Sequence, residues 1–370
     1  MEKVQKRNPI FSYLEALAII MVIDDHVSTR INIFSNIFPY NSFYMPMLVF
    51  ISGYFYKKQT IIQNIKHKFF HLFLPYVIWS LVGNGIAYLL MKCNIVYWYS
   101  PISWKSFYTL IAIGPISQIN GASWFVVMLI WVSVGYNIIR QLIHYDSKIT
   151  NYFLLAVSIV AGIVSLQLCL LGYSKNQYFL PFLRTLFYFQ FYHMGTMFKK
   201  YWEKYIQKAR TLYLCSLCSV INVILILIYG QKLNFCSTNE MSEFNSCIIP
   251  LITSVTGTLF WYKVMQFLAS RIGSIKIIDF ISENTFTIME AHLFFANIPN
   301  FYVFYKIKTG SMSYPDFDTA SFQQHPWIRY SPNSRLIGFI CGLVCSLILA
   351  YIIKKIRARF PLKRTCKIPD

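Results

Sequence analysis

The stretch NPIFSYLEALAIIMVIDDHV, residues 8–27, decides the fold class. It is an apolar run long enough to cross a bilayer as a helix, yet it carries Glu15 early and Asp24, Asp25 and His26 at its end. An ionisable side chain at membrane depth costs about 3 kcal/mol or more unless it faces a partner, a cavity or water. The run is therefore predicted to be a transmembrane helix with a polar face, and His26 is the first candidate for chemistry.

The composition is typical of an integral membrane protein. Of 370 residues, 56% are hydrophobic and only 13% are charged, and the mean hydropathy is +0.47. A soluble domain carries about 25% charged residues. Apolar runs of bilayer-spanning length recur from end to end, and no linker or low-complexity segment separates them. We therefore expect an all-α fold, a polytopic transmembrane helical bundle that forms one domain over residues 1–370.

Ten apolar runs are predicted to cross the membrane. A further apolar stretch, about 103–120, is interrupted by Gly114-Pro115 and Asn120-Gly121, so we expect it to form a re-entrant or surface helix covered by protein. If that stretch spans as well, the count becomes eleven and the termini fall on opposite sides. The ten predicted spans are residues about 10–27, 43–56, 69–91, 123–139, 150–172, 182–198, 212–230, 247–268, 278–303 and 334–353.

The positions of the basic residues favour ten spans. With the N-terminus inside, 24 of the 34 Lys and Arg residues fall on the cytoplasmic side, as the positive-inside rule requires. Both termini are therefore predicted to be cytoplasmic, and the expected location is a bacterial cytoplasmic (inner) membrane. The net charge of +20 does not indicate a nucleic-acid partner, because the basic residues come in short groups between apolar runs.

His26, at the outer end of the first span, is a candidate general base. Neutral imidazole accepts protons near neutral pH, and a carboxylate can orient it. Asp24 or Asp25 could supply that carboxylate, although adjacent residues on a helix do not face each other, which argues against Asp25 as the direct partner. Glu15, eleven residues earlier, lies about three turns away on nearly the same face. The alternative interpretation is an interfacial histidine satisfied by water.

A second polar cluster lies in the ninth predicted span, where His292 follows Asp279, Glu283 and Glu290. Three acids and a histidine in one apolar segment indicate a polar interior cavity. Catalysis by His292 is one interpretation, and a buried polar network that holds helices together is the other. The nine cysteines show no repeated spacing of metal ligands, so no metal site is predicted.

The end of the second span suits a phosphate-bearing ligand. Ser52 and Gly53 allow close approach to the backbone, and backbone amides together with clustered lysines bind phosphate. Ordinary lysines that set the topology are the alternative interpretation. The lysines that follow this span are Lys57, Lys58, Lys66 and Lys68.

Several of these stretches, taken in order, resemble one family. The opening RNPIFSYLEALAIIMVIDDH looks like the first span of the acyltransferase-three family of integral membrane O-acyltransferases. The family's second signature, especially in its fucose O-acetylase-like branch, is similar to two stretches of this chain. They are FYMPMLVFISGYFYKK and, shortly after it, KHKFFHLFLPYVIW. SWF at 123–125 resembles that branch's WFL element, and ISENTFTIMEAH at 281–292 resembles its late element ending in histidine. The similarity covers nearly the whole chain.

The resemblance implies an O-acyltransferase of the cell envelope. Such an enzyme transfers an acyl group, usually acetyl from acetyl-CoA, to a hydroxyl of a cell-surface or secreted polysaccharide. His26 would match the family's histidine, proposed as the base that deprotonates the acceptor, and the lysines after the second span would face cytoplasmic CoA. The implied partners are acyl-CoA, a glycan or lipid-linked saccharide acceptor and the lipid bilayer, with no permanently bound cofactor.

Two residues depart from the family pattern. Glu15 stands where the family has Arg or Lys, and Tyr44 stands where the branch commonly has His. A carboxylate cannot bind phosphate or an oxyanion as a cation does. We therefore expect either that Arg7 or Arg184 supplies the cation or that the activity is altered or lost.

Two other functions stay open on the sequence. The first is a transporter or exporter of a glycan or lipid-linked intermediate, with Glu15, Asp25 and Glu290 as proton-coupling or substrate groups. Transporters often show internal repeats, and none is found here. The second is a catalytically silent relative that serves as a scaffold, which the departures at Glu15 and Tyr44 favour.

Overall fold

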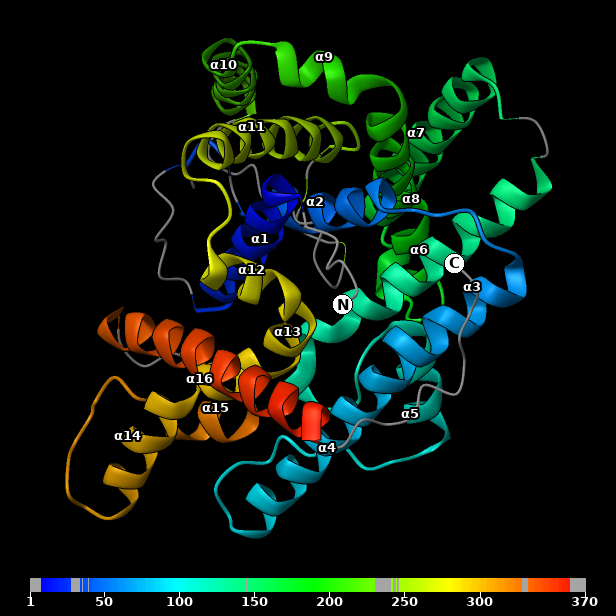
Figure 1. Cartoon of the computed structure of the whole chain (residues 1–370). Helices are drawn as coiled ribbons and strands as arrows, with labels where there is room; N and C mark the ends of the chain where they lie inside the picture. The colour runs from blue at the N-terminus through cyan, green and yellow to red at the C-terminus, as the bar shows by residue number, and fades with distance from the viewer. Residues whose placement is uncertain are drawn as a thin grey trace.

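The computed structural model is helical, with no strand among the residues that it describes (Figure 1). These residues are 8–27, 34, 36–38, 40–143, 146–229, 241, 244, 246–327 and 332–359. The α-helices are α1 (Pro9–Val27), α2 (Tyr40–Tyr54), α3 (Ile61–Lys68), α4 (Leu74–Lys92), α5 (Trp104–Tyr108), α6 (Trp124–Leu142), α7 (Lys148–Leu170), α8 (Leu180–Met197), α9 (Glu203–Lys208), α10 (Thr211–Tyr229), α11 (Ile249–Ile272), α12 (Lys276–Glu283), α13 (Thr285–Ala296), α14 (Ile298–Lys308), α15 (Thr319–Gln324) and α16 (Pro332–Arg359). The π- and 3-10-helical segments are η1 (Phe69–Phe73), η2 (Thr109–Ile113), η3 (Gln118–Ser123), η4 (Tyr173–Lys175) and η5 (Phe198–Trp202).

Each of the ten predicted spans coincides with a helix or a run of helices, so the all-α prediction is confirmed over the described residues. The ten-span count and the cytoplasmic termini stay predictions, and residues 1–7 and 360–370 lie outside the described part of the chain. Among the described residues, five helical stretches are long and apolar enough to cross a membrane: Ile61–Lys92, Trp104–Leu142, Lys148–Leu170, Thr211–Tyr229 and Arg335–Arg359.

Two stretches are broken where the backbone leaves helical geometry. The apolar stretch before α6 is interrupted as predicted, because η2 ends at Ile113, just before Gly114, and η3 begins only at Gln118. The segment 278–303, predicted as one span, is instead three helices. Asn284 has non-helical φ and ψ of −116° and 17°, and Pro299, in the first turn of α14, has no N–H to continue the ladder of α13.

Helix α1 lies in the middle of the molecule, packed against α2, α11, α12, α13 and α16 (Figure 1). It runs parallel to the α12–α13 pair. The Ser282 hydroxyl of α12 donates to Glu15 Oε2, and ten residues further along the chain the His292 ring of α13 stacks on that of His26. Two contacts at nearly equal spacing therefore fix the register between these helices.

Helices α2 and α8 approach each other closely through glycine. A Cβ at Gly53 would lie 1.9 Å from the carbonyl oxygen of Tyr192, and one at Gly195 would lie 2.0 Å from that of Phe50. The Ser52 hydroxyl donates to the Leu48 carbonyl one turn earlier, at 3.0 Å. Gly53 thus contributes to helix packing, while the Ser52 side chain bonds within its own helix.

The end of the bundle away from His26 is basic. The Phe11 ring, near the start of α1, contacts the Tyr54 ring at the end of α2, with 4.0 Å between centroids. Fifteen residues separate Phe11 from His26, which is about 22 Å along a helix that rises 1.5 Å per residue. Near this end, Asp146 pairs with Arg140 at 2.7 Å and with Lys200 at 2.6 Å. The two ends of α1 therefore lie in different chemical surroundings.

Candidate functional site

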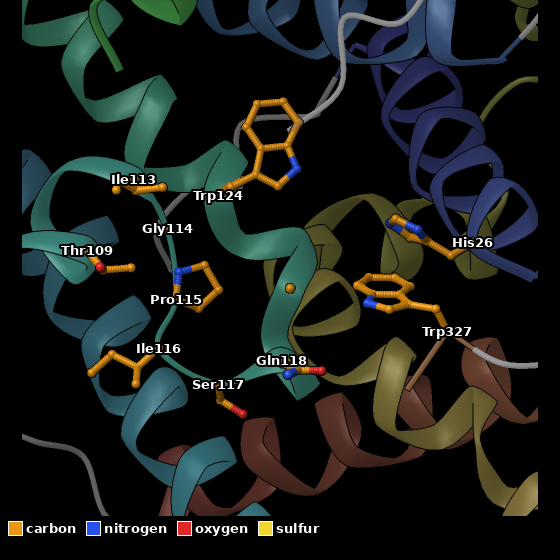
Figure 2. Close-up of a pocket in the computed structure, with 11 residues that line it drawn as sticks. His26, Thr109, Ile113, Gly114, Pro115, Ile116, Ser117, Gln118, Trp124 and Trp327 are labelled. Atoms are coloured by element: carbon orange, nitrogen blue, oxygen red, sulfur yellow. The ribbon is translucent and has the colours of Figure 1, made fainter. Parts of the chain in front are cut away.

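His26 lines a cavity of about 300 Å³, which we call the His26 cavity. Figure 2 shows His26 and Trp327 together on one side of it, across from the broken segment that carries Thr109, Ile113 and Pro115. Gly121 and Trp124, from η3 and α6, also line the cavity. The interruption before α6 thus supplies one wall of the space beside the candidate base.

The His26 ring lies between two aromatic side chains. Its centroid is 5.3 Å from that of His292, with 24° between the planes, and 5.4 Å from that of Trp327, at 45°. His26 is partly exposed, whereas His292 is fully buried. The structure therefore brings together the two histidines that the sequence singled out in different spans.

The backbone sets the protonation pattern of His292. Its Nδ1 lies 3.0 Å from the Ile288 carbonyl oxygen and 2.9 Å from that of Met289. A carbonyl oxygen only accepts, so Nδ1 must carry the proton and donate it. A neutral His292 ring therefore has its lone pair on Nε2.

Asp25 and Glu15 point to other partners. Tyr44 is buried, and its hydroxyl donates to Asp25 Oδ2 at 2.9 Å. Glu15 accepts from Ser282 and lies about 16 Å below His26 along α1, three turns away. Neither carboxylate lines the His26 cavity. Asp25 and Glu15 therefore form contacts between α1 and neighbouring helices, Asp25 next to His26 and Glu15 three turns away from it.

Arg184 places a buried cation next to the wall of the cavity. Its guanidinium carbon lies 5.0 Å from the centre of the Trp124 ring, and Nη1 donates to the Ile113 carbonyl oxygen at 2.7 Å. Both contacted residues line the His26 cavity. Arg184 is only 1% exposed, so its charge acts in a region of low dielectric. Arg7, the other candidate cation, lies outside the described residues.

Glu290 ties the cavity wall to the helix of His292. The Ser123 hydroxyl donates to Glu290 Oε2 at 2.6 Å, and the Asn120 amide donates to the same oxygen at 3.3 Å and to the Glu290 carbonyl at 2.8 Å. Glu290 is fully buried. The carboxylate thus joins η3 to α13, which supports the interpretation of this span as a polar network.

The candidate phosphate-binding residues lie at the basic end, apart from the His26 cavity. Lys57, Lys58 and Lys66 are exposed, and Lys68 is half-buried on α3. The loop that carries the first two is attached to α6, because Asn137 Nδ2 donates to the Gln59 carbonyl at 3.1 Å. None of these lysines lines the His26 cavity.

Sequence reasoning missed Trp327. It follows α15 in the chain, and nothing in the sequence pattern indicates that this one side chain reaches His26. Its ring also packs on Gly121, where an added Cβ would lie 2.9 Å from Trp327 Cζ2. Only the tertiary fold joins the two segments.

A helical bundle with membrane-length apolar helices and a cavity beside His26 is the architecture of a polytopic membrane protein with an interior site. A family model described as "Acyltransferase domain", that of the acyltransferase-3 family, matches residues 8–355, nearly the whole chain. The chain therefore belongs to this family and is a membrane acyltransferase. No curated protein matches it, and no solved structure does.

Proposed function

We propose that this protein transfers an acyl group, acetyl being expected, from acyl-CoA to a hydroxyl of a cell-surface or secreted glycan. The observation that carries the proposal is the placement of His26. Its ring is partly exposed to a cavity of about 300 Å³ and is backed by a buried histidine whose proton is held by the backbone. A base needs access to its substrate and a fixed orientation, and both are present.

The reaction follows from general base catalysis. A ring nitrogen of His26 removes the proton of the acceptor hydroxyl as its oxygen attacks the thioester carbonyl carbon. The tetrahedral oxyanion then collapses, the carbon–sulfur bond breaks, and the leaving thiolate takes the proton from the His26 imidazolium. The products are the acyl ester and free CoA thiol, so charge and protons balance. Arg184, beside the wall formed by Ile113 and Trp124, supports the developing oxyanion electrostatically.

The acceptor side of the cavity suits a sugar. Trp327 is 42% exposed and lies beside His26. A flat indole face next to a base can bind the apolar face of a pyranose while the hydroxyl edge turns toward the imidazole. This arrangement supports a glycan acceptor and assigns Trp327 to its orientation.

The donor is proposed to approach from the basic end of the bundle. Lys57, Lys58 and Lys66 present exposed charge there for the phosphates of CoA, with Lys68 beside them on α3. Ser52 and Gly53, at the end of α2, lie just before this lysine group. The bacterial cytoplasmic membrane is the proposed location, with this end inside.

Reconstituted vesicles test the reaction class. Purified protein is inserted into liposomes with acetyl-CoA labelled in the acetyl group on one side and an envelope polysaccharide extract on the other. The proposal predicts ester-linked label on the polysaccharide, removable by mild alkali. Movement of saccharide across the bilayer without any label on it would instead establish the transporter alternative.

A further inference from the structure

A second, larger cavity lies at the basic end, between the start of α7 and the η5–α9 segment. Its volume is about 800 Å³, in the range of sites that hold a compact organic ligand. Five lysines line it, and we call it the lysine cavity. They are Lys148, Lys199, Lys200, Lys204 and Lys208.

The positive charge of the lysine cavity is only partly balanced. Lys200 pairs with Asp146 at 2.6 Å, and Glu203 accepts from the Tyr54 hydroxyl at 3.0 Å. Among the described residues, Lys148, Lys204 and Lys208 form no ion pair. Like charges gathered in a concave site repel one another, and a bound anion relieves that repulsion. The electrostatics therefore call for a ligand with at least one phosphate or similar group.

Aromatic residues make the same cavity amphipathic. Tyr152, Tyr201, Trp202 and Tyr205 line it together with the lysines, and the Trp202 indole N–H donates to the Tyr152 hydroxyl at 3.0 Å. Trp202 also lines an apolar cavity of about 130 Å³ between α2, α8 and α11. Tyr and Trp beside Lys are typical of the bilayer–water interface. The charged cavity thus adjoins apolar space suited to hydrocarbon.

We propose that the lysine cavity binds the headgroup of an anionic glycerophospholipid of the surrounding leaflet. The lipid phosphate contacts Lys148, Lys204 and Lys208, and the aromatic residues cover the glycerol region. Basic pockets between membrane helices bind such headgroups. The acyl donor fits less well, because the lysines proposed for the CoA phosphates, Lys57, Lys58, Lys66 and Lys68, do not line the lysine cavity, and the lysine cavity shares no lining residue with the His26 cavity. The proposal does not depend on the acyl-transfer reaction.

Native mass spectrometry of the full-length protein tests this site, with dioleoylphosphatidylglycerol and dioleoylphosphatidylcholine as probes. The triple variant K148Q/K204Q/K208Q changes only exposed lysines, so the fold is expected to persist, and melting in neutral detergent checks this. A matched variant, K276Q/K355Q/R357Q, removes the same charge from exposed residues that line neither cavity. We expect the first variant to bind phosphatidylglycerol at least tenfold more weakly and the second to bind it like the unaltered protein.

Two results would overturn the proposal. One is an equal loss of phosphatidylglycerol in both variants, which would show a diffuse charge effect. The other is coenzyme A that binds the unaltered protein and is lost in K148Q/K204Q/K208Q while phosphatidylglycerol binding is retained, which would assign the cavity to the donor. Absence of acyl transfer in the vesicle assay bears on neither outcome.

Discussion

The imidazole rings of His26 and His292 lie 5.3 Å apart and within 24° of parallel, although 266 residues separate them in the chain. The contact joins α1 to α13 at the height of the His26 cavity. His292 holds its Nδ1 proton on its own helix backbone, so it can act as a neutral platform for the ring of the base. In this account His292 positions His26 and takes no proton itself.

Replacement of His292 separates positioning from proton chemistry. His292→Phe keeps an aromatic face, so kcat is expected to stay within about tenfold of the unaltered enzyme and the pH–rate profile to keep its shape. His292→Ala removes that face and leaves a buried void, and we expect kcat to fall about 100-fold. Steady-state rates across pH measure both. A His292→Phe variant that melts normally but has no activity would show that His292 handles a proton.

Trp327 is expected to act on acceptor binding. Trp327→Ala should raise the acceptor KM about fivefold, the equivalent of about 1 kcal/mol of lost aromatic contact, and leave kcat nearly unchanged. Trp327→Tyr should restore most of the affinity. Trp104, 90% exposed and not among the residues that line the cavity, provides the control in Trp104→Ala. An unchanged acceptor KM in Trp327→Ala would remove this residue from the site.

Glu290 is expected to support the cavity wall through its oxygen. Glu290→Gln keeps an acceptor for Ser123 and Asn120, so its melting temperature should stay close to that of the unaltered protein. Glu290→Ala leaves the buried Ser123 hydroxyl and Asn120 amide without this acceptor, at a cost of about 1–3 kcal/mol. Thermal melting and transfer rate measure the two variants side by side. Equal melting of both would argue against the network.

The glycine contact between α2 and α8 makes a clear packing prediction. Gly53→Ala would place a methyl group 1.9 Å from the Tyr192 carbonyl oxygen, so the helices must separate and we expect about 1–3 kcal/mol of destabilisation. At Gly135, in α6, an added Cβ meets no atom within 4 Å. Gly135→Ala should therefore be neutral or slightly stabilising. Melting temperatures in one detergent compare the two, and similar losses would refute the close approach.

The helices could be predicted from the sequence better than the arrangement of the candidate site. Every apolar run that was predicted to span the membrane coincides with one or more helices, and Gly114-Pro115 correctly marked the break before α6. Both signals are local in the sequence. The threefold division of 278–303 was missed because the overall hydropathy of the segment was weighed above the local break signals at Asn284 and Pro299. Four residues at or beside the cavity, His26, His292, Arg184 and Glu290, could be named in advance. The stacking of His26 on His292, and the entry of Trp327, depend on contacts between distant segments that no local pattern encodes.

The Asp146 loop predicts a pH effect on stability. Burial alone would raise the pKa of Asp146, but hydrogen bonds from Lys200, Asn151 and Arg140 outweigh it and lower the pKa well below its usual range. A lowered pKa in the folded state stabilises the protein above the ordinary carboxyl pKa, and this contribution is lost as pH falls. Asp146→Asn should therefore melt lower than the unaltered protein at pH 7, and the gap should begin to narrow only below the ordinary carboxyl pKa of about 4 and continue to shrink as pH falls further. A gap that stays constant with pH would contradict the account.

The central claim is that the imidazole of His26 takes the proton from the acceptor hydroxyl. The most direct test is to remove this side chain and measure the rate of acyl transfer. Initial rates of acetyl transfer from labelled acetyl-CoA are compared for the unaltered protein, His26→Ala and His71→Ala, which alters an exposed histidine outside the cavity. General base catalysis contributes about 100- to 10,000-fold, so we expect His26→Ala to lose at least 100-fold in kcat with normal melting, and His71→Ala to retain the full rate. Transfer by His26→Ala at the unaltered rate would contradict the account.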